Sequence, residues 1–362
     1  MQQSYAKSPP PGTGEADVKA NILIMLDKSG SMGRAQSTPD LRLPTDVAVN
    51  SAGLVHVVDW YDNAIKIFSA TGTLLHTNRK RWGRNYIYAA TKIVIDKYDN
   101  YWVLNRQGQE LFKYNSSHNL ECVYTYNMDG YTYNYMAHTM ATDSKGRIFI
   151  RKYSYPHIIV VNNDCSAAGA INAQGGSTIG INNSDEIFIT PYNSDSLRRI
   201  TDYDNKLSSL PSSGKPVSEW VVDNTESTYV IGDITSPANC SSGKVRGFLD
   251  MEFTDDGSLY GLDYLCNRMA KVSGPTGITP WSRNGSLGTW TVEGTFGSRG
   301  SGNNQWDDGY GFGSFGNDLY VADAQNARVL KYNTSTNFAT YDTKIGPSFS
   351  SMDMAKRVIK AV

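Results

Sequence analysis

The sequence predicts a mainly β fold in which one pattern of strands occurs six times. Each copy has an apolar strand, a polar turn rich in Asp, Asn or Gly, a second strand of alternating residues and, after a short polar step, a third strand. Aligned on the turn, the copies start near residues 50, 96, 143, 182, 254 and 314. Steps of roughly 40 to 70 residues are those of propeller blades, with insertions before the last two. We therefore expect a six-bladed β-propeller.

The six copies can be followed in order along the chain. Their strands cover 47–59 with 63–68, 93–104 with 110–114, 140–150 with 157–161, 179–189 with 197–200, 251–263 with 267–272, and 312–323 with 326–332. The first strand of a copy is apolar, as in Val-Ala-Val or Ile-Val-Ile, which is typical of a strand buried on both faces. The Asp/Asn-Gly turns supply the positive φ of tight hairpins. Asp59, Asp263 and Asp323 are expected to bond to backbone groups of the next turn, a structural role.

The segments outside the repeats have a different character. Residues 1–19 are polar and contain three consecutive prolines, so they predict a flexible leader. Residues 20–33 begin with a short apolar run that is typical of a buried parallel strand. The run ends in the pattern Asp27-x-Ser29-x-Ser31.

Residues 349–362 look like the continuation of residues 20–33. Met354, Val358 and Ile359 form an apolar stripe at helical spacing. Joined together, the two segments resemble the opening of a von Willebrand factor A domain, with its first strand, DxSxS loop and first helix. The resemblance implies an α/β domain that is incomplete in this chain and is interrupted by the propeller.

This resemblance also implies a divalent-cation site. In that family the two serine hydroxyls, here Ser29 and Ser31, bind Mg²⁺ or another divalent cation directly, and the aspartate, here Asp27, binds it directly or through water. A Thr and an Asp from two later loops complete the site, and those loops are absent from this sequence. The metal site is therefore expected to be incomplete, and a Ser-Gly turn is the alternative interpretation.

The repeats resemble NHL repeats. The resemblance is carried by residues 294–306, which lead to 319–323 and 326–330, and by residues 43–49, which are followed by 57–59. It is closest in the first and last copies and weakest in the middle three. The expected organisation is a leader (1–19), the first strand and metal loop of the A domain (20–33), an NHL-like propeller (34–348) and the first helix of the A domain (349–362).

Composition excludes several classes of function. The net charge is −1 and 19% of residues are charged, so no basic surface indicates nucleic-acid binding. No apolar run is long enough for a membrane span. The five histidines show no metal-ligand spacing, although His138 precedes an innermost strand and is able to face the channel.

The four cysteines, Cys122, Cys165, Cys240 and Cys266, contain no CxxC pair, which argues against zinc and dithiol redox chemistry. Two disulfides are the preferred interpretation, with Cys122–Cys165 and Cys240–Cys266 as one pairing. Four free buried thiols are the alternative.

Two further stretches are candidates for binding. A tyrosine-rich segment between the second and third copies offers a binding surface, or packs beneath its own loop. Its tyrosines are Tyr124, Tyr126, Tyr131, Tyr133 and Tyr135. The turns at Asp255-Asp256-Gly257 and Asp307-Asp308-Gly309 have oxygen ligands for Ca²⁺, although hairpin turns explain them better.

Together these features favour an extracellular or cell-surface adhesion or interaction protein that is not an enzyme. The propeller is expected to be a rigid platform for a protein or glycan ligand on another cell or matrix. Residues 18–32 also resemble the beginning of the A domain in PilC/PilY-type adhesins at type IV pilus tips, which implies pilus subunits as partners. One alternative is a structural subunit of an extracellular assembly or filament, joined through the incomplete A-domain segments to another chain or to the rest of its own A domain. Another is a lyase or hydrolase that uses the propeller channel.

Overall fold

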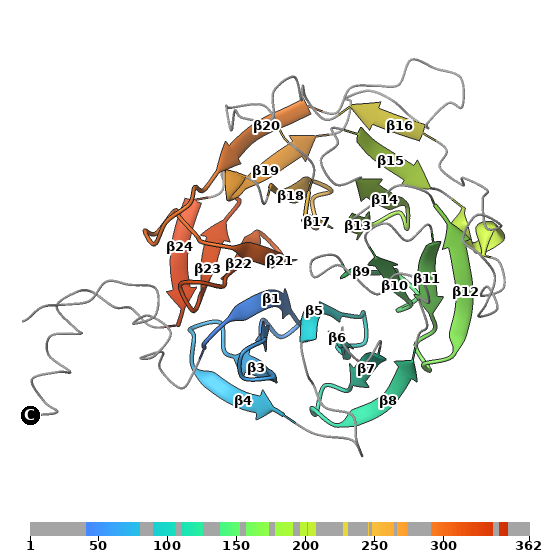
Figure 1. The fold of residues 1–362 in the computed structure, drawn as a ribbon, viewed down its shortest axis with the longest axis horizontal. Coiled ribbons are helices and arrows are strands. Elements are labelled where there is room, and N and C mark those ends of the chain that lie inside the picture. Colours follow the sequence, from blue (N-terminus) through green and yellow to red (C-terminus); the bar gives the residue numbers. More distant parts are fainter. Residues whose placement is uncertain are drawn as a thin grey trace, which may run out of the picture.

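The computed structural model describes residues 41–79, 90–105, 110–125, 138–152, 157–173, 178–190, 196–200, 202–207, 227–230, 245, 248–263, 266–273, 291–335 and 340–346. These residues form six four-stranded antiparallel sheets arranged as a ring (Figure 1). The predicted mainly β class and the predicted six-bladed β-propeller are therefore confirmed. The described part of the chain has no helix that is long and apolar enough to cross a membrane.

Each blade is built from four consecutive strands. The first blade has β1 (Pro44–Val49), β2 (Val55–Asp59), β3 (Ala64–Phe68) and β4 (Leu74–Asn78). The second has β5 (Ala90–Ile95), β6 (Tyr101–Asn105), β7 (Glu110–Tyr114) and β8 (Leu120–Thr125). The third has β9 (His138–Thr142), β10 (Ile148–Lys152), β11 (His157–Val161) and β12 (Ala167–Asn172). The fourth has β13 (Thr178–Ile181), β14 (Ile187–Thr190), β15 (Ser196–Ile200) and β16 (Ser227–Val230), with a 3₁₀ turn, η1 (Tyr203–Lys206), after β15. The fifth has β17 (Asp250–Phe253), β18 (Leu259–Asp263), β19 (Arg268–Ser273) and β20 (Thr291–Phe296). The sixth has β21 (Gly309–Phe315), β22 (Asp318–Asp323), β23 (Arg328–Asn333) and β24 (Thr340–Ile345).

The hairpin between the first two strands of a blade has a recurring design. In the first blade, Oδ1 of Asn50 accepts hydrogen bonds from the backbone N–H groups of Ala52 and Leu54, at 3.2 and 2.8 Å. The same bonds form in the next three blades, where the acceptors are Asp96, Asp143 and Asn182. The turn residue with positive φ is Gly53, Asp99, Gly146, Asp185 or Gly257. The predicted turn chemistry is confirmed, and in two blades an aspartate occupies the left-handed position instead of glycine.

The aspartates at the ends of the second strands make structural contacts, and at Asp59 these include the predicted bond to the backbone of the next turn. Asp59 accepts hydrogen bonds from the backbone of Asp62 in the next turn and from Arg42 and Leu43, which precede β1. Each of these aspartates also pairs with a basic side chain on the third strand of its blade: Asp59 with Lys66, Asp263 with Arg268, and Asp323 with Arg328. The aspartates therefore tie the innermost strand to the rest of the blade.

The first and last blades meet without sharing a strand. Among the described strands, every sheet takes its four members from one continuous stretch of chain. The ring is closed by side chains that pack between β1–β3 and β22–β23, including Val47, Val57, Tyr320 and Val329. Gly313 on β21 lies against β1, where an added Cβ would be 2.4 Å from the carbonyl oxygen of Val47. Hydrophobic packing and close backbone contact thus replace strand exchange at the closure.

One predicted disulfide is confirmed. Cys122 on β8 and Cys165 in the turn before β12 are bonded, so the bridge joins the second and third blades. Cys266 is also disulfide-bonded. Cys240, its predicted partner, lies outside the described residues. A bridge that closes a loop of 43 residues contributes about 2–4 kcal/mol to the free energy of unfolding.

The segments that resemble a von Willebrand A domain lie outside the described residues. These are residues 20–33, with Asp27, Ser29 and Ser31, and residues 349–362. The leader, residues 1–19, lies outside them as well. The described residues form the propeller, and they contain no part of an α/β domain.

Candidate functional site

The innermost strands place equivalent residues in layers around the propeller axis. The strand registers make one such layer from Asp46, Lys92, Thr139, Thr178, Asp250 and Gly311. Half of these positions carry charge, although strands in this place are otherwise apolar. A charged layer at the centre of a ring is costly unless its members pair with one another. Their contacts therefore decide what the layer does.

The charged layer is held together by one ammonium group. Nζ of Lys92 lies 2.6 Å from Oδ2 of Asp250 and 3.4 Å from Oδ1 of Asp46, and it donates to the carbonyl oxygen of Tyr310 at 3.2 Å. Because Lys92 belongs to the second blade and Asp250 to the fifth, this ion pair crosses the channel. The network also includes Asp46 in the first blade and Tyr310 in the sixth, so it connects four of the six blades.

Backbone groups complete the network. The N–H of Ile93 donates to Asp46 at 2.8 Å, and the N–H of Phe312 donates to Asp250 at 3.2 Å. Gly311 leaves the necessary space, since a Cβ there would lie 1.9 Å from Oδ1 of Asp46. Burial raises the pKa of both aspartates, an effect that Lys92 opposes. Burial would lower the pKa of Lys92, but the two carboxylates outweigh it, so the pKa of this lysine is raised.

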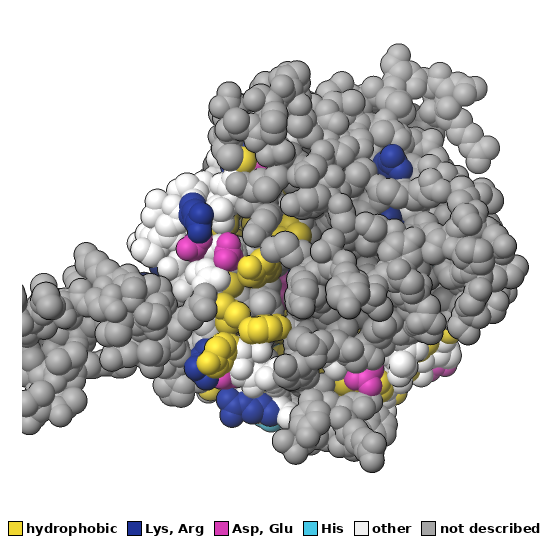
Figure 2. All heavy atoms as spheres, viewed as in Figure 1, with side chains coloured by type: hydrophobic (Ala, Val, Ile, Leu, Met, Phe, Trp, Pro, Cys, Tyr) yellow, Lys and Arg dark blue, Asp and Glu magenta, His cyan; other side chains and the backbone are white. Residues whose placement is uncertain are grey.

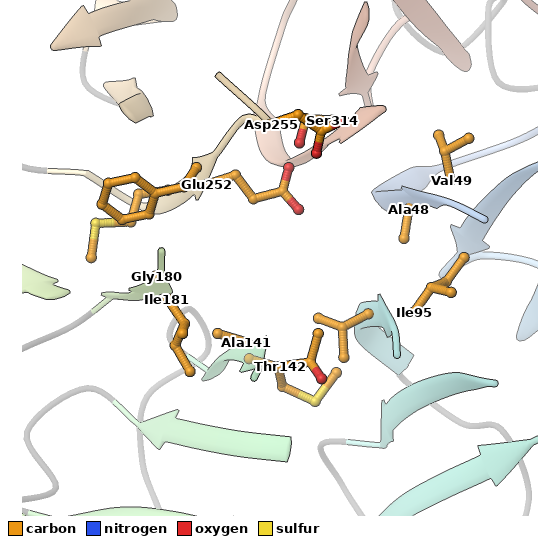
Figure 3. Close-up of a pocket in the computed structure, with 14 residues that line it drawn as sticks. Ala48, Val49, Ile95, Ala141, Thr142, Gly180, Ile181, Glu252, Asp255 and Ser314 are labelled. Atoms are coloured by element: carbon orange, nitrogen blue, oxygen red, sulfur yellow. The ribbon is translucent and has the colours of Figure 1, made fainter. Parts of the chain in front are cut away.

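A cavity of about 290 Å³ lies on the axis next to this network. All six innermost strands line it, and they contribute Val49, Ile95, Thr142, Ile181, Phe253 and Ser314 at their hairpin ends. The adjoining layer contributes small side chains, among them Ala48, Ala141 and Gly180. Glu252 is the exception in that layer, and Figure 3 shows its carboxyl group pointing into the middle of the cavity. The site is thus a small chamber, lined by apolar side chains and polar groups, with one carboxyl group at its centre.

Glu252 has an unusual electrostatic environment. Burial, together with the carboxylates of Asp250 and Asp46, raises the pKa of Glu252 well above its ordinary value. A hydrogen bond from Ser314 and the charge of Lys92 act in the opposite direction. Oε2 of Glu252 is buried and has no hydrogen-bond partner among the described residues. The same holds for Oγ1 of Thr142, on the third blade.

The hairpins around this end of the channel are joined to one another. Ser51 donates its backbone N–H to Asp99 of the next blade at 2.9 Å, and its hydroxyl donates to the other carboxylate oxygen at 2.5 Å. Ser144 makes the equivalent pair of bonds to Asp185, with the backbone bond at 2.8 Å. These pairs of hydrogen bonds join the first blade to the second and the third blade to the fourth. The rim of the cavity is therefore cross-linked at two of its blade junctions by these side chains.

Of the candidate residues predicted from sequence that the structure describes, Asp255 lines this cavity and the others do not. Tyr124 lies on β8, half-buried against a core cluster that includes Trp102 and Leu111. The four other tyrosines, Tyr126, Tyr131, Tyr133 and Tyr135, lie outside the described residues. Asp256 accepts hydrogen bonds from Thr254 and Ser258 in its hairpin turn. Within the described ranges, no group of three or more His, Cys, Asp or Glu side chains is arranged to hold a metal ion.

Three histidines that are far apart in the sequence meet between the first two blades. The rings of His76 and His118 are stacked with centroids 4.4 Å apart, and His56 lies 6.2 Å from His118. Tyr101 packs against His56 at 5.0 Å. Burial lowers the pKa of His56 to about 4. His138 begins β9, and its side chain lies outside the described part of the structure.

The opposite end of the first blade carries exposed aromatic side chains. Trp60 and Tyr61, which follow β2, are 41% and 51% exposed, and the guanidinium of Arg42 lies 3.7 Å from the Tyr61 ring centroid. On the face seen in Figure 1, hydrophobic and basic side chains lie together over the first blade (Figure 2). This patch is at the Asp59 end of β2, whereas the cavity is at the Val55 end.

Comparison with solved structures agrees with the propeller architecture. Virginiamycin B lyase from Staphylococcus aureus matches with a TM-score of 0.51 and 13% identity, over 85% of this chain and 86% of that chain. A streptogramin B lyase matches with a TM-score of 0.52 and 10% identity, over 87% and 86%. A putative 6-phosphogluconolactonase from Bacteroides uniformis matches with a TM-score of 0.50 and 14% identity, over 86% and 87%. At such identities the likeness shows the fold alone.

Comparisons at the level of sequence give no match. No family model matches the chain. No curated protein is detectably similar to it. The class that the fold and the site define is thus a six-bladed β-propeller with an axial cavity.

Proposed function

We propose that this protein is a binding protein whose propeller holds a small organic ligand in the axial cavity. The observation that carries the proposal is the cavity itself, about 290 Å³, which takes a wall residue from every blade. Small-molecule sites are concave, mostly apolar and furnished with a few polar groups that orient the ligand. Glu252, Thr142 and Ser314 are such groups here.

The wall chemistry favours recognition over catalysis. Ester or amide hydrolysis, and elimination next to a carbonyl group, develop negative charge on oxygen, which enzymes stabilise with cations or fixed hydrogen-bond donors. None of the described cavity residues is Lys, Arg or His. The nearby ammonium of Lys92 is already paired with Asp46 and Asp250. Reactions of these two kinds would need charge stabilisation that the described cavity residues do not supply.

The test is to fill the cavity. We expect some members of a mixed panel of small neutral and charged compounds to raise the melting temperature of the full chain, and Ala141→Leu to abolish that effect. A ligand at a hundred times its Kd adds about 2.7 kcal/mol of stability. Ala70→Leu, at an exposed turn, is the matched control. A panel without effect, or equal shifts in wild type and Ala141→Leu, would contradict the proposal. Ligands recovered chemically unchanged would support binding over turnover.

A second role, metal-dependent adhesion outside the cell, is favoured by the pattern Asp27-x-Ser29-x-Ser31 and its resemblance to the von Willebrand A metal loop. The disulfides support an oxidising, extracellular location. We propose that this loop contributes to a Mg²⁺-dependent contact with a protein or glycan once another segment supplies the remaining ligands. Calorimetric titration of Mg²⁺ into the full-length gene product tests this role, and equal affinities for wild type and Asp27→Ala would refute it.

A further inference from the structure

The cavity contains polar atoms that a ligand would satisfy. Oε2 of Glu252 and Oγ1 of Thr142 are both buried, and neither has a partner among the described residues. They come from the fifth and third blades and so line different sides of the chamber, as Figure 3 shows. A buried polar atom without a partner destabilises the structure, and more so when the group is charged. A ligand that hydrogen-bonds to Glu252 would remove this cost.

The charged residues along the axis indicate the sign of the charge on that ligand. Four carboxyl groups, those of Asp46, Asp250, Glu252 and Asp255, share the region with the single ammonium of Lys92. Lys92 contacts the first two of them. No described cavity residue supplies a positive charge to the other two. Since Asp255 is exposed, Glu252 is the buried carboxyl group of this region that has no described cation in contact with it.

We infer that the cavity binds the protonated amino group of a small aliphatic amine, with the carboxylate of Glu252 as its counter-ion. This inference rests on the proposed function and names the class of its ligand. An ammonium group donates up to three hydrogen bonds, and Glu252 and the hydroxyls of Ser314 and Thr142 are the acceptors that line the cavity. The alkyl part of the amine packs against Val49 and Ile181.

Other cations fit less well. Mg²⁺ and Ca²⁺ take six or more oxygen ligands, and the described residues hold no group of three or more His, Cys, Asp or Glu side chains arranged to hold a metal ion. A quaternary ammonium ion has no N–H group, so it would leave Oε2 of Glu252 without a hydrogen bond. A neutral alcohol is able to hydrogen-bond to the carboxyl group, but it supplies no positive charge to stabilise the ionised form. A primary or secondary amine meets both requirements.

The binding equilibrium should depend on pH. Since burial and the nearby carboxylates raise the pKa of Glu252, this carboxyl group holds its proton to a higher pH than a free glutamate does. An ammonium ion requires the ionised form, so binding releases a proton from Glu252. Amine affinity should therefore rise with pH until the amine itself, with an ordinary pKa near 10, loses its charge.

Calorimetric titration of the full chain with isobutylamine hydrochloride and with its neutral isostere isobutanol tests the inference. At pH 8 we expect the amine to bind about tenfold tighter than the alcohol or better. Glu252→Gln keeps the shape of the side chain and should weaken amine binding about 10- to 100-fold, the value of a hydrogen bond to a charged group. Its affinity for isobutanol should stay within about threefold. Glu121→Gln, which removes an exposed carboxylate on β8, should change neither affinity.

The outcomes separate this inference from the proposed function. If isobutanol binds, Ala141→Leu abolishes its binding and the amine binds no tighter, the cavity remains a binding site but the inference that its ligand is an amine is wrong. Amine binding that Glu252→Gln leaves unchanged, or tetramethylammonium binding tighter than isobutylamine binding, would also overturn it. Amine affinity that falls from pH 8 to pH 5, with proton uptake or release that differs between wild type and Glu252→Gln, would support it. If neither compound binds and the wider panel also fails, both proposals fall.

Discussion

Replacing Lys92 with methionine is expected to lower the free energy of unfolding by about 3–5 kcal/mol at pH 7.5, the usual cost of breaking a buried ion pair on one side. Lys92 is 6% exposed, and its ammonium is the only described cation in contact with Asp46 and Asp250. Methionine fills a similar volume, so the loss of stability measures the effect of removing the charge more than the effect of changed packing. The two carboxyl groups would then repel each other across the channel with only backbone N–H groups to stabilise them.

The sign of the pH dependence distinguishes this explanation from a packing defect. Burial already places the pKa of Asp46 and of Asp250 above the ordinary value, so both groups favour folding when protonated. Their contribution is complete below the ordinary pKa near 3.8 and is lost as pH rises through the folded-state pKa. Removing Lys92 raises the folded-state pKa values further. The stability difference between wild type and Lys92→Met should therefore grow as pH rises through about 7, where Asp46 ionises in the wild type but keeps its proton in the variant.

Urea denaturation at several pH values measures this difference. Lys145→Met is the matched control, because Lys145 is paired with Asp204 at an exposed site, where a salt bridge is worth about 0–1 kcal/mol. Adding Asp250→Asn to Lys92→Met should recover part of the loss, since it removes one of the unpaired charges. A Lys92→Met penalty that is the same at pH 4.5 and pH 7.5 would show that the ammonium acts through packing rather than charge.

The ring of blades was predictable because its signals are local. In the first four blades, the hairpin combines an amide or carboxylate that caps the turn, such as Asn50 or Asp96, with a residue of positive φ three positions later. The apolar innermost strands follow from burial between neighbouring blades. These features depend on residues within about ten positions of one another and recur in several copies, so a weak copy is supported by a strong one.

The axial site was not predicted, because its partners are joined only by the closed ring. Lys92 and Asp250 are 158 residues apart and belong to blades on opposite sides of the channel. In the sequence, Glu252 in Met-Glu-Phe looks like the polar member of an alternating strand. One signal was present: Asp46, Lys92 and Asp250 each stand four residues before the hairpin residue of their blade, in otherwise apolar strands. Charge at one repeat position in several copies is what indicates a shared layer.

The three histidines between the first two blades are a second example of contacts that the sequence does not predict. Nothing in the spacing of His56, His76 and His118 predicts that they meet, because they belong to two blades and come together only when those blades pack. By contrast, the disulfide between Cys122 and Cys165 was predictable from cysteine number and chain order. With four cysteines and no CxxC pair, few pairings remain to choose from. Contacts between blades that do not involve cysteines leave no comparable signal in the sequence.

Trp306 is one of the largest fully buried side chains of the described structure and precedes β21 of the last blade. Its indole is fully buried, with Phe296 at 6.2 Å and Tyr332 at 6.3 Å between ring centroids. It covers Gly297, where an added Cβ would lie 1.9 Å from the ring. Gly297 has a φ of +88°, so glycine serves there both for its backbone conformation and for the space that the indole occupies.

We expect Trp306→Ala to lower the free energy of unfolding by about 3–5 kcal/mol, since it removes a large buried side chain and leaves a cavity beside Gly297. Trp306→Phe should cost much less, because it keeps an aromatic ring and removes an indole N–H that has no partner in the described structure. Trp60→Ala, at a tryptophan that is 41% exposed, is the matched control and should change stability by less than about 1 kcal/mol. Chemical denaturation of the three variants compares them directly. Equal losses for Trp306→Ala and Trp60→Ala would mean that the indole of Trp306 does not hold the last two blades together.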